Sequence, residues 1–333
     1  MRLTRRSTLA LGGAAAASLA APAIAQAQPT TVGALRFTSH AASFVALERG
    51  YFADEGLDVS FEFFQAAQPM AVAIASRDAD YAVTAISGGL INLAAKGAAR
   101  VIGGALSEEP GIDGQLILAS NDSGVDAPAG LDGKRWGMTT AGSSFHYVGS
   151  KMAQAEGIDL EYVPLQKVPA LIGALKSSQI DGWEIVPHIA KPLVASGAAR
   201  MIGRVSDYLP DYQVTTVFTS AENAANDRAR TEAFLRAFSR GASDFNAALV
   251  DKTASEEEQE AMVRLIHGYV YTDRELEAAA PAIIDGAMRV NEGAALNMAS
   301  VEDQMEWFRS EGLIDASIET ATLVDDSYVE TIS

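Results

Sequence analysis

The chain has 333 residues, a length that predicts about two domains. Hydrophobic types make up 48% and charged types 20%, the composition of a folded, water-soluble protein rather than of a disordered one. The 43 Asp and Glu residues outnumber the 25 Lys and Arg residues, and a net charge of −18 argues against binding to nucleic acid or anionic lipid. There is no cysteine, which excludes disulfides, iron-sulfur clusters, thiolate metal sites and cysteine nucleophiles.

Residues 1–27 predict a secretory signal peptide. Arg5 and Arg6 precede an apolar run over 9–21, and the small residues at 23–25 suit cleavage near residues 25 to 27. The run is too short for a membrane span. The paired arginines resemble a twin-arginine export signal, with ordinary Sec export as the alternative. Removing this segment with its three arginines takes the net charge from −18 to −21, so we expect an acidic periplasmic protein.

The next part of the chain alternates short β-rich runs with helical stretches, which predicts an α/β lobe with a largely parallel sheet. The predicted strands are 32–37, 59–64, 81–84 and 100–105, and the helices between them are 42–49, 66–77 and 90–96.

A second lobe is predicted after a strand over 115–120 and a turn-rich stretch over 121–133. Its strands are 134–139, 162–165 and 180–185, and its helices are 145–155, 170–178 and 188–196. A strand over 214–219 follows, and the chain from 228 onward reads as mostly helical. The acidic run 256–260 is interpreted as a solvated helix face, and Trp136 as a core residue.

Two Gly/Ser-rich turns follow predicted strands and open helices, one in each lobe. The carboxyl ends of parallel strands and the N-termini of helices gather free N–H groups, which suit an acceptor group of a ligand. The alternative for each turn is a plain helix N-cap. The candidate ligand-binding residues in these turns are Thr84, Ser87, Thr139, Gly142, Ser143 and Ser144.

Planar and titratable side chains follow other strand ends and predict a stacking pocket around the turns. His40 and His146 are either ligand donors or structural histidines. Strand alternation allows only one of Phe63 and Phe64 to face a ligand. Glu184 is either a solvated acid or the acceptor for an amino group. The candidates in this set are Ser39, His40, Phe64, Gln65, Phe145, His146, Trp183 and Glu184.

Five segments in order resemble periplasmic solute-binding proteins of ABC importers, in the subfamily that serves nitrate, sulfonates, taurine, bicarbonate and thiamine-pyrimidine precursors. The resemblance covers about residues 31–315. The segments are ERGYFADEGLDVSF, SRDADYAVTAISGGLINLAAKGAARVIGG, LDGKRWGMTTAGSSFHYVG, ALKSSQIDGWEIVPHIA and MEWFRSEGLID.

This resemblance implies an α/β, two-lobed, type II-like periplasmic binding protein fold with two crossing strands and a ligand cleft between the lobes. Lobe one is then expected to comprise residues 28–118 and 216–333, and lobe two residues 119–215. Many members carry Trp, then an acid, then Pro in the region of Trp183, whereas here Glu184 is separated from Pro187. Thiamine-pyrimidine synthases of related fold use a cysteine-rich iron motif, which this chain lacks.

The resulting hypothesis is a monomeric, non-enzymatic binding protein that delivers a small organic solute to the membrane permease of an ABC importer. The expected ligands are an aromatic acid or a pyrimidine, with alkyl sulfonates next. A periplasmic sensor is the second hypothesis, and a serine-type hydrolase using Ser143 or Ser144 with His40 is the remote third. The four histidines give no local metal-ligand pair, so we expect neither a metal nor another cofactor.

Overall fold

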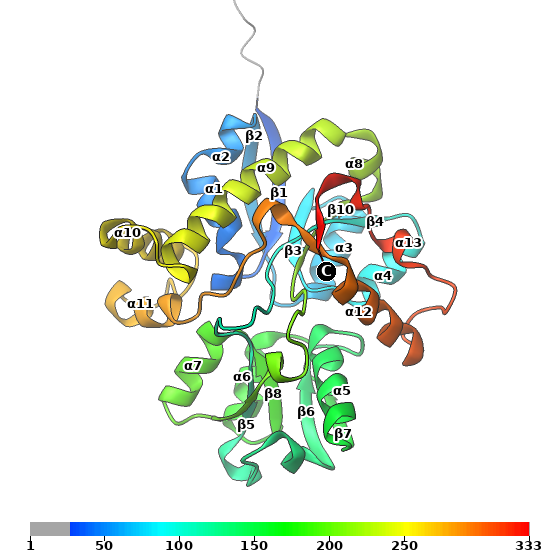
Figure 1. Ribbon diagram of the computed structural model, residues 1–333, viewed down its shortest axis with the longest axis vertical. Coiled ribbons are helices and arrows are strands. Elements are labelled where there is room, and N and C mark those ends of the chain that lie inside the picture. Colours follow the sequence, from blue (N-terminus) through cyan, green and yellow to red (C-terminus); the bar gives the residue numbers. More distant parts are fainter. Residues whose placement is uncertain (1–26, 333) are drawn as a thin grey trace, which may run out of the picture.

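Two five-stranded sheets organise the chain into an upper and a lower lobe (Figure 1). The computed structural model describes residues 27–332, so the predicted signal peptide lies outside the described residues except for Ala27. We call the unit around the first sheet lobe one, residues 27–104 and 216–332. Lobe two is the unit around the second sheet, residues 116–204.

The sheet of lobe one has the strand order β2-β1-β3-β10-β4. β1 pairs in parallel with β2 and β3, whereas β10 runs antiparallel to β3 and β4. The central strands β3 and β10 are buried along their whole length, as expected for a sheet covered on both faces. The strands are β1 Gln28–Ala34, β2 Leu57–Phe63, β3 Tyr81–Thr84, β4 Ala99–Gly104 and β10 Thr216–Ser220.

The sheet of lobe two repeats this arrangement with the order β7-β6-β8-β5-β9. Here β6 pairs in parallel with β7 and β8, and β5 is the antiparallel strand between β8 and β9. In each sheet the antiparallel strand is the one that enters directly after the chain crosses from the other lobe. The strands are β5 Leu116–Ala119, β6 Lys134–Met138, β7 Leu160–Pro164, β8 Gly182–Ile185 and β9 Arg200–Arg204.

Two segments, 105–115 and 205–215, connect the lobes, and they pair with each other. The backbone N–H of Ala105 donates to the carbonyl oxygen of Thr215 at 3.0 Å, and that of Glu108 donates to Tyr212 at 2.9 Å. The lobe boundary predicted at residue 118 falls inside β5, whose residues all pair in the second sheet, so the chain changes lobe earlier than expected. The boundary predicted between 215 and 216 coincides with the start of β10.

Helices cover both sheets, and the C-terminal third of the chain supplies most of those on lobe one (Figure 1). The long helix α9 packs against α1 and α2, with the Phe234 ring stacked between Tyr81, at 4.2 Å, and Phe52, at 5.3 Å. The helices of lobe one are α1 Ala41–Glu48, α2 Tyr51–Asp54, α3 Ala67–Ser76, α4 Gly88–Ala95, α8 Ala221–Asn226, α9 Arg228–Phe245, α10 Glu256–His267, α11 Leu276–Ile284, α12 Met298–Ser310 and α13 Thr320–Leu323.

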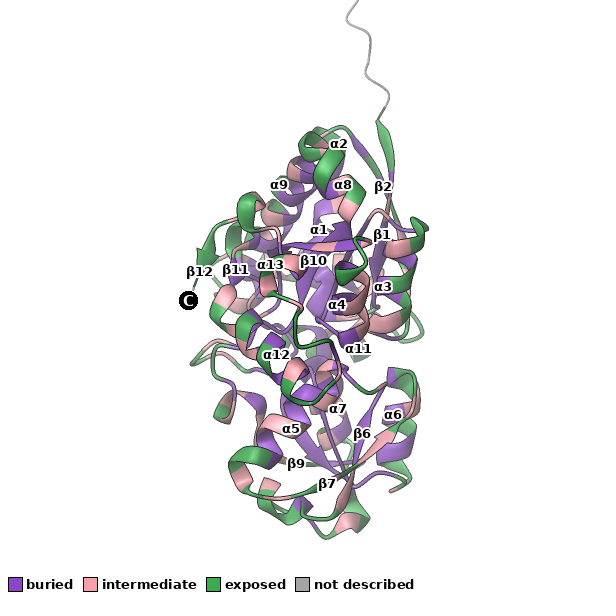
Figure 2. Cartoon of the chain, turned by 90° about the vertical axis from the view of Figure 1, so that its right-hand side faces the viewer, coloured by how far each residue is buried: buried purple, intermediate pink, exposed green. Residues whose placement is uncertain are grey.

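Lobe two buries its core around Trp136, which is fully inaccessible to solvent, as the sequence predicts. Its indole Nε1 donates to the carbonyl oxygen of Phe145 at 2.8 Å, and Gly149 leaves room for the ring, since a Cβ there would lie 2.5 Å from Nε1. Figure 2 shows the buried residues concentrated in the centre of each lobe. The helices of lobe two are α5 Ser144–Glu156, α6 Val168–Lys176 and α7 Pro187–Ala195.

Every strand predicted from the sequence is present, with ends displaced by at most four residues. β9 and the short pair β11 Leu296–Asn297 and β12 Thr331–Ile332 were not predicted, because arginines at both ends of β9 and a glycine within it hide its apolar pattern. Among the helices of residues 27–332, none is long and apolar enough to span a bilayer.

Candidate functional site

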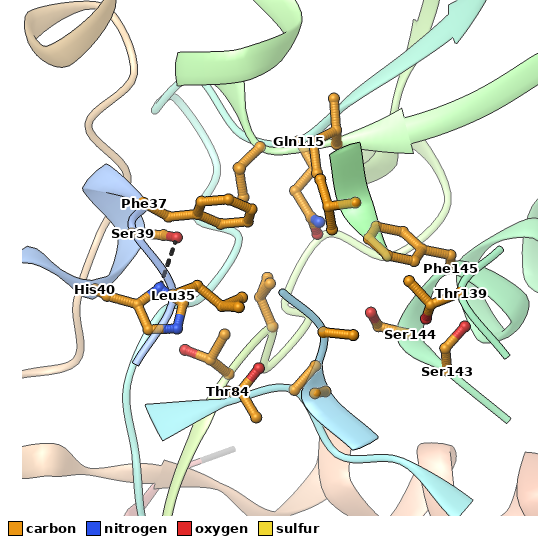
Figure 3. Close-up of a pocket in the computed structure, with 18 residues that line it drawn as sticks. Leu35, Phe37, Ser39, His40, Thr84, Gln115, Thr139, Ser143, Ser144 and Phe145 are labelled. Carbon is orange, nitrogen blue, oxygen red and sulfur yellow. Dashed lines mark hydrogen bonds between the residues drawn. The ribbon is translucent and has the colours of Figure 1, made fainter. Parts of the chain in front are cut away.

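A cavity of about 60 Å³ lies between the lobes, and residues of both lobes line it (Figure 3). Such a volume holds a few water molecules, whereas a cavity that binds benzene measures about 150 Å³. No lining residue has a charged Lys, Arg, Asp or Glu side chain. The lining residues are Leu35, Phe37, Ser39, His40, Ala66, Ala67, Thr84, Ala85, Gln115, Thr139, Ser143, Ser144, Phe145, Val168, Ile185, Val186, Val214 and Thr215.

The walls are built from the carboxyl ends of parallel strands in both lobes, where the sequence places them. In lobe one they follow β1, β2 and β3, in lobe two they follow β6, β7 and β8, and the crossing segments complete them. Of the predicted site residues, the structure brings together Ser39, His40, Thr84, Thr139, Ser143, Ser144 and Phe145 around this cavity.

The two Gly/Ser turns differ in detail. Ser87 is the N-cap of α4, and its hydroxyl accepts a hydrogen bond from the N–H of Leu90 at 3.2 Å, which is the plain capping alternative. Ser143 is the N-cap of α5 but caps nothing with its side chain, and its buried Oγ has no partner among the described residues. Ser144 begins the helix and makes no capping bond. Ser87 therefore caps a helix of lobe one, whereas Ser143 of lobe two lines the cavity and keeps an unpaired hydroxyl.

Gly142 contacts lobe one instead of lining the cavity. Its carbonyl oxygen accepts from the N–H of Gly88 at 2.9 Å, and its N–H donates to Nδ1 of His146 at 3.1 Å. Its φ of +72° is a conformation that glycine adopts without strain. His146 packs edge-on against Trp307, at 5.1 Å, and burial lowers its pKa. The ring thus stabilises the turn from outside the cavity, which corrects its predicted place as a ligand donor.

Two histidines from opposite lobes meet beside the cavity, and we call His40 and His188 the interlobe histidine pair. The Phe37 ring lies against both, at centroid distances of 6.0 Å from His40 and 5.0 Å from His188. Burial lowers the pKa of His40 to about 4, opposed by a backbone hydrogen bond at Val83. Burial and the neighbouring His40 lower the pKa of His188 to about 3. Both rings are therefore neutral near pH 7.

Two buried carboxyl groups flank Gln115, one from the first crossing segment and one from β8, and we call Glu108 and Glu184 the hinge carboxyl pair. Gln115 joins them: its backbone N–H donates to Oε1 of Glu108 at 2.8 Å, and its Nε2 donates to Oε2 of Glu184 at 2.8 Å. Burial raises the pKa of Glu108 to about 7, against the hydrogen bond from Gln115 and the charge of Arg204. Burial and the nearby Glu108 raise the pKa of Glu184 well above its usual value.

Trp183 and Glu184 were predicted as ligand contacts, but both lie behind the cavity wall. The Trp183 side chain is fully buried, with its ring 5.5 Å from that of Phe145. Glu184 is neither solvated nor in the cavity, and it reaches the cavity only through Gln115. Strand β8 is buried on both faces, so alternation along it could not indicate which side chain faces the ligand.

Phe64 and Gln65 line an outer hollow that shares Leu35, Phe37 and Val168 with the cavity. Phe63 also lines this hollow, where the Arg36 guanidinium lies 3.8 Å from its ring centre. The carbonyl oxygen of Gln65 accepts from the N–H of Val168 at 3.1 Å, which is another contact between the lobes.

Sequence reasoning missed Phe37 and Gln115, the two most informative lining residues. Phe37 is the last residue of the first predicted strand and lies two residues before Ser39, so its place at a strand end indicated a candidate. Gln115 is a lone polar residue at the start of an apolar strand, a signal that was present but unused. The remaining missed residues are small or aliphatic: Leu35, Ala66, Ala67, Ala85, Val168, Ile185, Val186, Val214 and Thr215.

The geometry for serine hydrolysis is incomplete. Nδ1 of His40 lies 3.2 Å from Oγ of Ser39, and no hydrogen bond connects His40 to Ser143 or Ser144 in the described part of the chain. Within residues 27–332, no three His, Asp or Glu side chains are grouped as a metal site would require.

Comparison with known proteins gives a family and a fold. The sequence profile of a family described as NMT1/THI5 like matches residues 37–248, more than half of the chain. Comparison with curated protein sequences finds no match.

Solved structures of similar fold cover nearly the whole chain. The alkanesulfonate-binding protein SsuA of Xanthomonas axonopodis pv. citri, bound to MOPS, shares 16% identity at a TM-score of 0.72, covering 90% of this chain and 98% of that one. The nitrate-binding protein NrtA of Synechocystis PCC 6803 shares 15% identity at 0.65, covering 89% and 84%. The desulfurization enzyme DSZB shares 15% identity at 0.60, covering 90% and 97%. The two-lobed periplasmic binding protein fold predicted from the sequence is confirmed.

Proposed function

The chain belongs to the NMT1/THI5-like family, and from that premise we propose that it is the solute-binding component of an ABC importer. It captures a small organic solute between its lobes and presents the closed form to a membrane permease. The observation that carries this proposal is the interlobe cavity, whose walls come from strand ends of both lobes.

Because residues of both lobes line the cavity, a bound ligand would favour closure of the lobes. Lobe-to-lobe contacts ring the cavity: Gly88 with Gly142, Val168 with Gln65, and the Tyr271 hydroxyl with the carbonyl oxygen of His188. On the far side, Asp303 of α12 accepts a hydrogen bond from Lys151 of α5 at 2.8 Å. A ligand that touches both walls binds the closed arrangement better than an open one and shifts the population toward closure. The permease then recognises the closed arrangement.

A ligand screen by thermal unfolding tests this function. At a hundred times its dissociation constant, a ligand that binds only the folded state adds about 2.7 kcal/mol of stability, roughly several degrees in midpoint for a chain of this size. Calorimetry would measure the affinity, and small-angle scattering would report closure. Failure of every solute of the sulfonate, pyrimidine, aromatic-acid, amide, urea and lactam classes to bind or to close the lobes would contradict the proposal.

The Ser143 hydroxyl provides a mutational test of where the ligand sits. Because this buried Oγ has no partner among the described residues, we expect Ser143→Ala to weaken ligand binding by about 1 to 3 kcal/mol. Ser87→Ala is the matched control, since that hydroxyl caps α4, and it should reduce stability by about 1 kcal/mol with little change in affinity. Equal affinities in wild type and Ser143→Ala would remove this hydroxyl from the site.

Export to the periplasm is part of the proposal, with Arg5 and Arg6 as the signal. Replacing both by Lys should leave the precursor in the cytoplasm if the twin-arginine route is used. Undiminished periplasmic protein would indicate Sec export.

Two alternatives have distinct readouts. A sensor would bind ligand with the same closure, yet deleting the gene would abolish a transcriptional or chemotactic response and leave uptake unchanged. A serine-type hydrolase would turn over ester substrates, and Ser143→Ala or Ser144→Ala would abolish that turnover.

A further inference from the structure

Gln115 presents its amide to the interlobe cavity. The residue lies where the first crossing segment enters β5, and 3% of it is exposed to solvent. Figure 3 shows its amide end lying between the rings of Phe37 and Phe145, one from each lobe. A planar solute in this cavity would therefore lie next to the amide.

In the structure the hinge carboxyl pair orients the amide of Gln115 with its nitrogen toward Glu184. Nε2 donates to Oε2 of Glu184, and the backbone N–H of Gln115 is held by Glu108. Oε2 of Glu184 can accept this bond in both protonation states, because a proton on the carboxyl can reside on Oε1. The carbonyl Oε1 of Gln115 is left buried, with no partner among residues 27–332.

The surroundings of this oxygen disfavour anions. The lining residues carry no Lys or Arg side chain, and the carboxyl groups of Glu184 and Glu108 lie directly behind Gln115. Arg36 lies in the outer hollow over the Phe63 ring. An anionic solute would meet an unpaired carbonyl oxygen and no compensating cation, whereas an N–H donor would satisfy that oxygen.

We propose that Gln115, oriented by Glu184, determines specificity by accepting a hydrogen bond from the solute, so that the cleft selects uncharged planar compounds with N–H donors, of the amide, urea or lactam type, over nitrate and sulfonate anions. This inference rests on the proposed solute-binding function and assigns the substrate class of that site.

Matched probes of equal size test the selection. Urea and nitrate are both planar with four heavy atoms, and methanesulfonamide and methanesulfonate differ in the donor and the charge. Ligand-observed NMR and calorimetry on the mature protein at neutral pH should give dissociation constants at least tenfold lower for the uncharged member of each pair. Equal or tighter binding of the anions would overturn the proposal, and so would failure of both uncharged probes to bind.

Variants assign the selection to Gln115. Gln115→Met keeps the length of the side chain and removes the acceptor, so the preference for the uncharged probes should fall at least tenfold. Gln154→Met, on the exposed face of α5, is the matched control and should keep the wild-type ratio. Wild-type selectivity in a folded Gln115→Met protein would overturn the assignment, with thermal unfolding as the check of folding.

Glu184 is tested as a positioning residue. Glu184→Leu frees the amide to rotate, so selectivity should fall while Gln115 is still present, and Glu184→Gln, which retains an acceptor, should restore it. Unchanged selectivity in Glu184→Leu would remove Glu184 from the proposal. An anionic ligand found in the thermal screen would refute the selectivity but leave the solute-binding function standing, whereas a screen without any ligand would refute both.

Discussion

The interlobe histidine pair and the hinge carboxyl pair are both buried, yet burial acts on them in opposite senses. It lowers the pKa of His40 and His188 and raises the pKa of Glu108 and Glu184, because the neutral form is favoured in each case. Histidine is neutral when deprotonated and glutamate when protonated. The two pairs therefore make stability depend on pH with opposite signs.

Their hydrogen bonding differs as well. Each carboxyl group accepts a hydrogen bond from Gln115, so the hinge pair is tied to the cavity. Neither ring nitrogen of His188 has a partner among the described residues, and the ring packs edge-on against the rings of Phe37 and Tyr271. Both pairs thus carry a pH-dependent penalty, but only the hinge carboxyl pair is also ordered by hydrogen bonds to Gln115.

The largest expected change in folding stability comes from replacing Glu108 of the hinge carboxyl pair. In the unfolded chain the Glu108 carboxyl ionises above pH 4.5, whereas in the folded chain it ionises only above about pH 7. Folding stability is therefore lost as pH rises from 4.5 to 7. At about 1.36 kcal/mol per pKa unit, the loss amounts to about 3 kcal/mol at pH 8. Glu108→Gln should therefore raise the free energy of unfolding by about 2 to 3 kcal/mol at pH 8, with little gain at pH 4.5.

Urea denaturation at the two pH values measures this difference. Glu257→Gln, on the exposed face of α10, removes the same charge from the surface and serves as the control. An equal gain at pH 4.5 and pH 8 would show that the Glu108 carboxyl does not carry the pH dependence.

The next largest change in stability is expected for the interlobe histidine pair, at acidic pH. Above pH 6.5 the His188 ring is neutral in both the folded and the unfolded chain. As pH falls below 6.5, His188 becomes protonated in the unfolded chain, whereas in the folded chain it stays neutral down to about pH 3. The free energy of unfolding therefore decreases. His188→Leu should remove this loss and gain about 2 kcal/mol more at pH 5 than at pH 8.

The charged and titratable groups around His188 are few, and they bear on this expectation. They are His40 on the lobe-one side, Tyr271 with its ring 6.2 Å away, and, on the same helix, Lys191, whose ammonium bonds Asp113 and the carbonyl oxygen of Asp285. His267→Asn is the control, because His267 lies at the end of α10 and not at this contact between the lobes. If His267→Asn and His188→Leu alter the pH dependence equally, the interlobe pair is not its source.

The smallest effect concerns Tyr212, whose buried hydroxyl has no partner among the described residues. Burial and the carboxyl groups of Glu184 and Glu108 raise its pKa well above the ordinary value. Tyr212→Phe removes the unpaired hydroxyl, so we expect stability to be unchanged or raised by up to about 1 kcal/mol. A loss of more than 1 kcal/mol on thermal unfolding would mean that the hydroxyl bridges the hinge carboxyl pair.

Part of the candidate site could be predicted from the sequence because the ends of the predicted strands determine where its residues lie. Ser39, His40, Thr139 and Ser143 follow predicted strands, and the ends of parallel strands meet at one edge of a sheet. The errors concern side-chain direction. His146 directly follows lining residue Phe145, but its ring packs against Trp307. Glu184 directly precedes lining residue Ile185, but its carboxyl group accepts from Gln115.

The sequence by itself determined the alternation of strands and helices, the family and the strand ends that form the cleft, because these depend on local hydrophobic patterns and turn chemistry. Only the tertiary structure decided that Ser87 caps a helix while Ser143 leaves its hydroxyl free, that Phe37 meets His188 across the lobes, and that Gln115 lies between two carboxyl groups. Each of these features brings together residues that are far apart in the chain, or it depends on the direction of one side chain. The hydrophobic periodicity of the sequence carries no information on either.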